Sequence, residues 1–410
     1  MYNKTILDNQ LRVVTEHLPS NTVSVGVWVD VGSRDELSNI SGCAHFVEHM
    51  LFKGTSTRDA NEIAKELDCL GGMSNAFTSK EATCFYGTVL GHQVDQLVAI
   101  IADLLQNSLF LKTEVEKEKQ VVLQEISMVE DTPEDLIHDL LAQAIWQGHP
   151  LAKPVLGTAP TISSINSDLL SGFVKSHYSP ERILIAASGN IDHEALVESV
   201  SKQFGKLSPV DAANSRLRFE RVKPEQISPQ MIVKKKPLEQ AHLLFSTYCP
   251  PINDPTRYEI ALLNVLLGGN MSSRLFQELR EKQGLAYSIY SFVDAMSDSG
   301  TLAIYAGVGP KSVQKASQMI NDVVKSLNET ITKDEVDRAR DYARTGIFLA
   351  SESMEARMTR LAKSELYFER YYSLEEVDQE LSNVTHERIC VVAESLFETP
   401  MTSVMLGPVD

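Results

Sequence analysis

The chain has 410 residues, of which 43% are hydrophobic and 23% are charged, and its formal net charge is −17. This length predicts two or three domains, and the composition is typical of a globular protein with sizeable cores. The negative charge disfavours nucleic-acid binding as the main task, because phosphates would be repelled, whereas basic peptides would be attracted. Solubility alone is an equally good explanation of the charge.

The cysteines and the N-terminal residues favour a cytoplasmic protein. The five cysteines are scattered and form no Cys-x-x-Cys pair, as expected of reduced thiols. The first twenty residues lack the apolar run of a secretory signal, and Asp8 and Glu16 make them a poor transit peptide. No stretch approaches the roughly 18 consecutive apolar residues of a membrane span. We expect a cytoplasmic protein without such a span, and a matured organelle protein is the alternative.

The first half of the chain begins with strands and continues mostly with helices. Apolar and small residues alternate in TVSVGVWVDVG (22–32), which predicts a strand. The residues SNAFTSKEATCFYGTVL (74–90) are typical of a hairpin, and 182–191 of another strand. Apolar residues at helical spacing predict helices over 44–51, 59–71, 92–108, 112–146 with a break near Pro133, and 193–207.

The second half repeats this order of elements. The residues YAGVGPKSVQKASQMINDVV from Tyr305 match YGTVLGHQVDQLVAIIADLL from Tyr86 without a gap, which indicates an internal duplication. We therefore predict an α+β fold with two homologous lobes, each a mostly antiparallel sheet with helices packed on one face. The expected division is an N-terminal lobe over 1–206, a polar linker region over 207–239 and a C-terminal lobe over 240–410.

The segment GCAHFVEHMLFKGT (42–55) contains the spacing His-x-x-Glu-His. On a helix, His45 and His49 lie on one face and Glu48 lies on its neighbouring edge. Two imidazoles so placed can hold one zinc ion, and the glutamate can reach water beside it. The alternative is a pair of ordinary core or surface histidines on an amphipathic helix.

A catalytic zinc needs a third protein ligand. The helical residues EKEKQVVLQEI (116–126) carry Glu118 and Glu125, which are seven residues apart and point the same way. One could bind the metal while the other orients a ligand histidine. By spacing alone, a solvated acidic helix face explains these two glutamates better.

The residues HFVEHMLFKGT, GGMSNAFTSKEATCFY and EKEKQVVLQEI together resemble the pitrilysin/insulinase family of zinc peptidases, and most closely its short processing proteases. The resemblance covers nearly the whole chain. It implies that His45, His49 and Glu125 bind zinc, that Glu48 is the catalytic base, and that Glu118 supports a ligand histidine. The second half has apolar residues in place of this motif, so we expect one zinc ion per chain.

The resemblance also implies residues that bind the peptide. Asn75 and Ala76 lie in GGMSNAF, which is similar to the family's substrate-binding edge strand; an exposed strand edge can bind an extended peptide. Arg280 and Tyr287 in REKQGLAY resemble a pair that stabilises the oxyanion. Without the resemblance, these four residues would belong to an ordinary hairpin, the surface and the core.

We therefore expect a zinc metalloendopeptidase that cleaves short or unfolded peptides, with basic or presequence-like peptides as the expected substrates. The expected assembly is a homodimer, or a heterodimer with a homologous chain. Two other functions remain open. One is a non-catalytic assembly or peptide-binding subunit of a larger complex, and the other is a peptide scavenger that binds zinc but turns over slowly.

Overall fold

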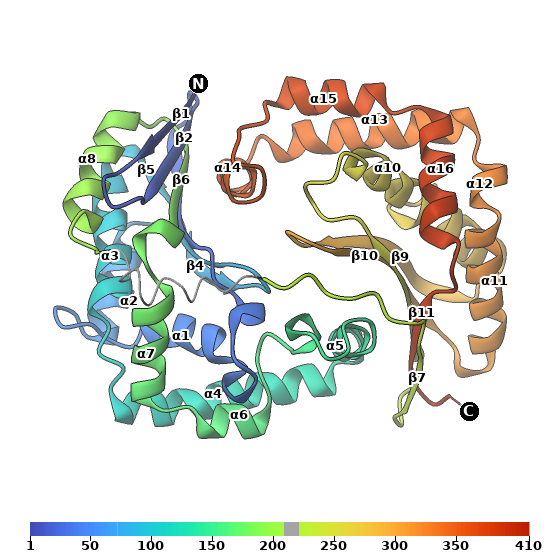
Figure 1. Cartoon of the computed structure of the whole chain (residues 1–410), viewed down its shortest axis with the longest axis horizontal. Coiled ribbons are helices and arrows are strands. Elements are labelled where there is room, and N and C mark those ends of the chain that lie inside the picture. The colour runs from blue at the N-terminus through green and yellow to red at the C-terminus, as the bar shows by residue number, and fades with distance from the viewer. Residues whose placement is uncertain (72, 209–220, 410) are drawn as a thin grey trace. The chain divides into compact units, whose positions relative to one another are not determined.

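The computed structural model of the chain describes residues 1–71, 73–208 and 221–409 (Figure 1). Residues 209–220 of the expected linker region lie outside the described residues. None of the described helices is long and apolar enough to cross a lipid bilayer.

The described strands form two sheets, each built from one half of the chain. The first sheet has the order β1-β2-β6-β3-β5-β4, and the second has the order β7-β11-β8-β10-β9. The pairs β2–β6 and β7–β11 are parallel, and the other neighbours are antiparallel. The strands are β1 (Tyr2–Ile6), β2 (Arg12–His17), β3 (Thr22–Val29), β4 (Met73–Thr78), β5 (Thr83–Leu90), β6 (Ile183–Gly189), β7 (Met231–Lys235), β8 (Ala241–Cys249), β9 (Ala286–Ala295), β10 (Gly300–Val308) and β11 (Thr402–Gly407).

The helices occupy the segments where the sequence has helical periodicity, and the long predicted helix breaks at Thr132, just before Pro133. In the first half they are α1 (Cys43–Leu51), α2 (Ala60–Cys69), α3 (Val94–Asn107), α4 (Lys112–Asp131), α5 (Pro133–Ile145), α6 (Ala159–Ser164), α7 (Ser167–His177) and α8 (His193–Phe204). In the second half they are α10 (Arg257–Gly268), the π-helix η6 (Phe276–Lys282), α11 (Val313–Lys325), α12 (Leu327–Thr330), α13 (Lys333–Ala350), α14 (Met354–Phe368), α15 (Leu374–Asn383) and α16 (His386–Phe397).

The duplication extends through most of the chain at one constant offset. Helix α3 begins at Val94 and α11 begins at Val313, so the offset is 219 (313 − 94). A single 3-10 turn precedes each helix, at Gly91–Gln93 and Pro310–Ser312, again 219 apart. The starts of β2 and β7, of β3 and β8, of β6 and β11, and of α7 and α16 are separated by the same number. The predicted α+β fold with two homologous lobes is therefore confirmed.

In the first compact unit, α14 covers the face of the sheet opposite to α1, α3 and α8 (Figure 1). Alternate side chains of β3 pack against the helices on opposite faces of the sheet. Val25 and Val27 join the large core under α1 and α3, whereas Trp28 packs with Met358 and Leu361 of α14. The unit consists of 1–127, the described part of 153–221, and 350–371.

The second unit has a corresponding arrangement. Helix α5 packs on one face of the second sheet, where Ile137 and Leu141 meet Leu244 of β8, while α10 and α16 lie on the other face (Figure 1). This unit consists of 128–152, 222–349 and 372 to the end of the described residues.

Helices α5 and α14, each of which packs on one face of a sheet, are equivalent members of the duplication. Helix α5 begins at Pro133 and α14 at Met354, close to the common offset, yet each packs on the sheet made by the other half of the chain. The compact units are therefore discontinuous in sequence, unlike the continuous division 1–206, 207–239 and 240–410. Each sheet also carries helices on both faces rather than on one, because both faces of its central strands are apolar.

Candidate metal centre

At the start of helix α1, two backbone N–H groups donate hydrogen bonds to a buried carboxylate. Glu36 accepts hydrogen bonds from the backbone N–H groups of Gly42 (2.8 Å) and Ala44 (2.6 Å), so the first turn is capped. Gly42 has a φ of 92°, and a Cβ there would lie 2.6 Å from the carbonyl oxygen of Leu156. The apolar face of α1 is buried against the sheet, which leaves its histidines on the partly exposed side.

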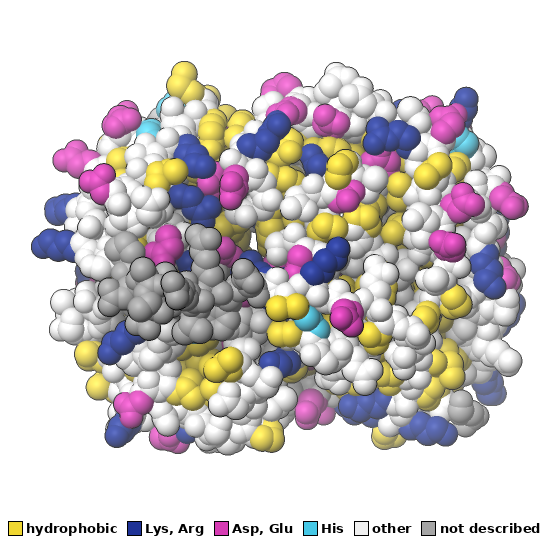
Figure 2. Space-filling model, viewed as in Figure 1, with side chains coloured by type: hydrophobic (Ala, Val, Ile, Leu, Met, Phe, Trp, Pro, Cys, Tyr) yellow, Lys and Arg dark blue, Asp and Glu magenta, His cyan; other side chains and the backbone are white. Residues whose placement is uncertain are grey.

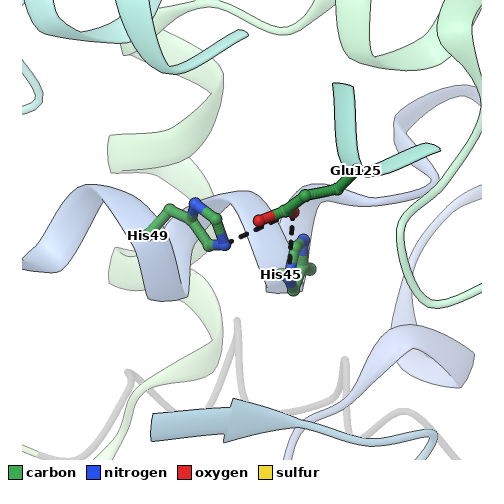
Figure 3. Close-up of side chains that lie close together, drawn as sticks. All are labelled: His45, His49 and Glu125. Atoms are coloured by element: carbon green, nitrogen blue, oxygen red, sulfur yellow. Dashed lines mark ion pairs between the residues drawn. The ribbon is translucent and has the colours of Figure 1, made fainter. Parts of the chain in front are cut away.

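His45, His49 and Glu125 converge from α1 and α4 (Figure 3). Oε2 of Glu125 lies 3.8 Å from Nε2 of His45 and 3.6 Å from Nε2 of His49. Ligand atoms around a tetrahedral zinc ion would be about 3.3 Å apart at ordinary zinc–ligand distances. This is the one group in the described residues in which three such side chains are close enough to hold a metal ion.

The carboxylate of Glu125 fits a metal ligand in a second respect. Its Oε2 is buried, and it accepts no hydrogen bond from the described residues. An uncompensated buried oxygen is costly unless a cation or a donor satisfies it. Because two imidazole nitrogens face the same oxygen, the donor set suits zinc.

Glu118 fixes the orientation of one imidazole. Its Oε1 lies 2.8 Å from Nδ1 of His49, and its Oε2 lies 2.7 Å from Nζ of Lys53. Burial alone would raise the pKa of Glu118, but hydrogen bonds from His49 and Lys53 hold it below the ordinary value. An ionised Glu118 accepts a hydrogen bond from the Nδ1–H group of His49, which leaves Nε2, the nitrogen that faces Glu125, for a metal.

The two histidines titrate differently. Burial, followed by the neighbouring charge of His49, lowers the pKa of His45 to about 4, so His45 is neutral near pH 7. Burial also acts to lower the pKa of His49, but the hydrogen bond to Glu118 and the nearby carboxylates outweigh it and raise this pKa above the ordinary value. A neutral imidazole is the form that binds a metal.

Glu48 is 9% exposed and accepts a hydrogen bond from Oγ1 of Thr78, across 2.5 Å, at Oε2. Burial raises the pKa of Glu48 above the ordinary value, against the opposing effects of Thr78 and His49. A carboxylate with a raised pKa, next to a metal site, can take a proton from water.

The edge strand β4 carries two of the expected substrate residues. Asn75 is exposed and pairs in register with Tyr86 of β5, and Ala76 pairs with Phe85. In the described residues, β4 has a neighbour on one side only. Among the described residues, β4 thus presents a strand edge next to the helix of the histidines, and β-augmentation by a peptide would need such an edge.

Arg280 and Tyr287 lie together in the second unit. The guanidinium carbon of Arg280 is 5.0 Å from the centroid of the Tyr287 ring and 4.7 Å from that of Phe276. Both Phe276 and Arg280 belong to the π-helix η6. The Tyr287 ring is exposed rather than in the core.

Sequence reasoning missed Thr78 and Lys53. Thr78 follows Ala76 by two residues, so the period of a strand places both side chains on one face. Lys53 follows His49 by four residues, which is the spacing of neighbours on a helix. Both signals were present, but only the tertiary structure shows which carboxylate each residue meets.

The second half does not contain this donor set. At the common offset of 219, the position equivalent to His45 holds Asn264, that of His49 holds Gly268 and that of Glu125 holds Arg344. The expectation of apolar residues at the two histidine positions was wrong at Asn264, which is polar, but none of the three residues is a typical zinc ligand.

Two family models match the sequence. A model described as "Insulinase (Peptidase family M16)" matches residues 12–159, and "Peptidase M16 inactive domain" matches residues 164–342. The first range contains the histidines, Glu48 and Glu125, and the second contains the equivalent positions Asn264 and Gly268.

Curated relatives cover the whole chain. The protein named "Uncharacterized zinc protease YmxG" of Bacillus subtilis is 38% identical over 100% of this chain and 98% of its own length. The "Uncharacterized zinc protease ML0855" of Mycobacterium leprae is 40% identical, over 99% of this chain and 91% of its own.

Two solved structures share the fold. A protease from Helicobacter pylori has a TM-score of 0.91 at 23% identity, covering 100% of this chain and 99% of its own. A Pseudomonas fluorescens protein, titled as a peptidase M16 inactive domain, has a TM-score of 0.90 at 20% identity, covering 100% and 98%.

Proposed function

Since the chain belongs to peptidase family M16, the insulinase/pitrilysin family of zinc peptidases, we propose that it is a zinc-dependent endopeptidase acting on short or unfolded peptides. The observation that carries this proposal is the convergence of His45, His49 and Glu125, with Glu48 on the same helix as the histidines.

In this proposal, His45, His49 and Glu125 hold one zinc ion per chain. A bound zinc ion would polarise a water molecule and lower its pKa towards 7. Glu48 accepts the proton as the water attacks the scissile carbonyl, and then passes it to the leaving amine. Glu118 keeps His49 in the tautomer that presents Nε2 to the site.

The peptide is proposed to bind as an added strand along β4. Backbone hydrogen bonds at Asn75 and Ala76 would hold it extended, which an unfolded or short peptide allows and a folded protein does not. Arg280 and Tyr287 are proposed to bind the carbonyl oxygen and stabilise the oxyanion. Their contact at 5.0 Å supports a shared role.

We also propose that the chain forms a homodimer, with a heterodimer of homologous chains as the alternative. In either dimer, Arg280 and Tyr287 act in the chain's own site or in the site of the partner chain. Light scattering distinguishes a dimer from a monomer. Mixing a Glu48→Gln chain with an Arg280→Ala chain shows in which chain's site Arg280 acts. Cleavage recovered in the mixture means that Arg280 of one chain acts in the site of the other chain. The cytoplasmic location stays a prediction that cell fractionation would test.

A second candidate is a non-catalytic peptide-binding or assembly subunit, and the match of 164–342 to a model named as an inactive domain favours it. The decisive experiment combines metal analysis with cleavage of a quenched peptide before and after chelation. Bound zinc and chelator-sensitive cleavage support the peptidase, and zinc with very slow turnover supports a scavenger. Peptide binding without zinc or cleavage supports the second candidate.

A further inference from the structure

The net charge of −17 does not by itself identify a surface for basic peptides. On the face drawn in Figure 2, acidic and basic side chains are interspersed. Selectivity for a basic residue therefore requires a particular carboxylate beside the peptide.

The side chains of β4 alternate between two environments. Ala76 packs against the core that includes α1, and Thr78 reaches Glu48. Phe77 points to the other face, where its ring lies 5.4 Å from that of Trp28 and 6.2 Å from that of Tyr86. Phe77 is nevertheless 37% exposed, because it lies on an edge strand.

Glu355 approaches this second face from the first turn of α14. It precedes the buried Met358 by three residues, so both lie on the side of the helix that packs on the sheet. Burial raises the pKa of Tyr86, and the nearby charge of Glu355 raises the pKa of Tyr86 further. Tyr86 is also the register partner of Asn75 on β4.

The carboxylate of Glu355 forms no ion pair with a Lys, Arg or His of the described residues. It is partly exposed, so it remains available to a cation from outside the chain. The neighbouring helix residue Arg357 is not such a partner, since its guanidinium is bound to Glu16 at 3.1 Å.

We infer that Phe77 and Glu355 form a subsite for a lysine or arginine side chain of a peptide bound along β4. The inference rests on the proposed function and names its substrate class. Side chains of an added strand alternate as those of β4 do, so a peptide residue next to Phe77 faces α14 while its neighbours face α1. The cation lies over the aromatic ring, and Glu355 neutralises it.

The test uses the zinc-loaded full chain and a set of quenched peptides that differ at one position at a time, with Arg, Gln or Glu there. The variants are Glu355→Gln and Glu355→Lys, and Glu352→Gln is the control because it removes an exposed carboxylate in the turn before α14. We expect the unmodified chain to prefer Arg over Gln about tenfold in kcat/KM at one position. Glu355→Gln should remove most of this preference, Glu355→Lys should turn it towards Glu, and the control should retain it.

Zinc-dependent cleavage without any preference for Arg would overturn the subsite alone. The same holds for a preference that persists in both Glu355 variants. If the unmodified chain cleaves none of the peptides, or cleaves them equally after zinc removal, the proposed function fails and the subsite fails with it. Comparable melting temperatures for the variants show that a loss of preference is not a loss of folding.

Discussion

Oγ1 of Thr78 donates a hydrogen bond to the carboxylate of Glu48 across 2.5 Å, and so joins the end of β4 to the middle of α1. Through this contact, the strand proposed to bind the peptide also orients the proposed base. Arg34 and Glu81 form a buried ion pair at 2.5 Å next to the same hairpin turn and hold it in place.

Thr78→Val should therefore reduce kcat/KM about tenfold while the zinc content is unchanged. The hydrogen bond from Thr78 lowers the pKa of Glu48, so its loss raises that pKa further. Because the base must be ionised, the acidic limb of the pH profile should move to higher pH. Thr78→Ser retains the hydroxyl and should retain the profile. An unmoved acidic limb in the valine variant would mean that Thr78 does not act on the base.

Glu118→Gln should weaken zinc binding about 10- to 100-fold, because the neutral amide orients His49 less well and raises its basicity less. Competition with a chelator of known affinity measures the change. Glu116→Gln is the matched control on the same helix, since Glu116 is exposed and pairs with Lys119. Equal zinc affinities for the two variants would argue against a supporting role for Glu118.

Met358→Ala should destabilise the first unit by about 2–5 kcal/mol, since it leaves a cavity between α14 and the sheet. The thioether sulfur also accepts a hydrogen bond from Nε1 of Trp28 at 3.3 Å, so the tryptophan fluorescence should change before unfolding. Urea unfolding measures the free energy. Met128→Ala removes an exposed methionine and should change it by less than about 0.5 kcal/mol. Similar losses in both variants would refute a specific role for the α14 contact.

A fragment of residues 1–206 lacks α14 and should expose the second face of its sheet. Cys69 is exposed in any case and reacts with or without α14. Cys84 lies on the second face and Cys43 lies in the core under α1, so a thiol reagent should modify Cys84 before Cys43. Adding a peptide of residues 350–371 should slow the modification of Cys84. Protection of Cys84 in the fragment alone would show that the N-terminal lobe closes this face without α14.

The sequence predicted the duplication and the helix-breaking effect of Pro133, because both depend on patterns along the chain. It also predicted which side chains lie near one another within α1 and within α4. The partners of α5 and α14 could not be found in this way. Periodicity identifies an amphipathic helix, but both sheets offer an apolar second face, and the pattern does not say which sheet a helix covers.

The sequence likewise predicted only part of the candidate site. Spacing placed His45 and His49 on one helix face, but for Glu118 and Glu125 it favoured solvated glutamates, and only the resemblance gave them roles. The hydrogen bond from Thr78 to Glu48 joins residues 30 positions apart. It depends on the register of β4 against β5, which the sequence does not specify.

The central claim is that Glu48 is the base beside a zinc ion held by His45, His49 and Glu125. Glu48→Gln tests it most directly, with bound zinc and peptide cleavage measured on the same preparation. The account predicts one zinc ion per chain, as in the unmodified protein, and a loss of cleavage of at least about 100-fold. Cleavage at the unmodified rate by the zinc-loaded Glu48→Gln chain would contradict it.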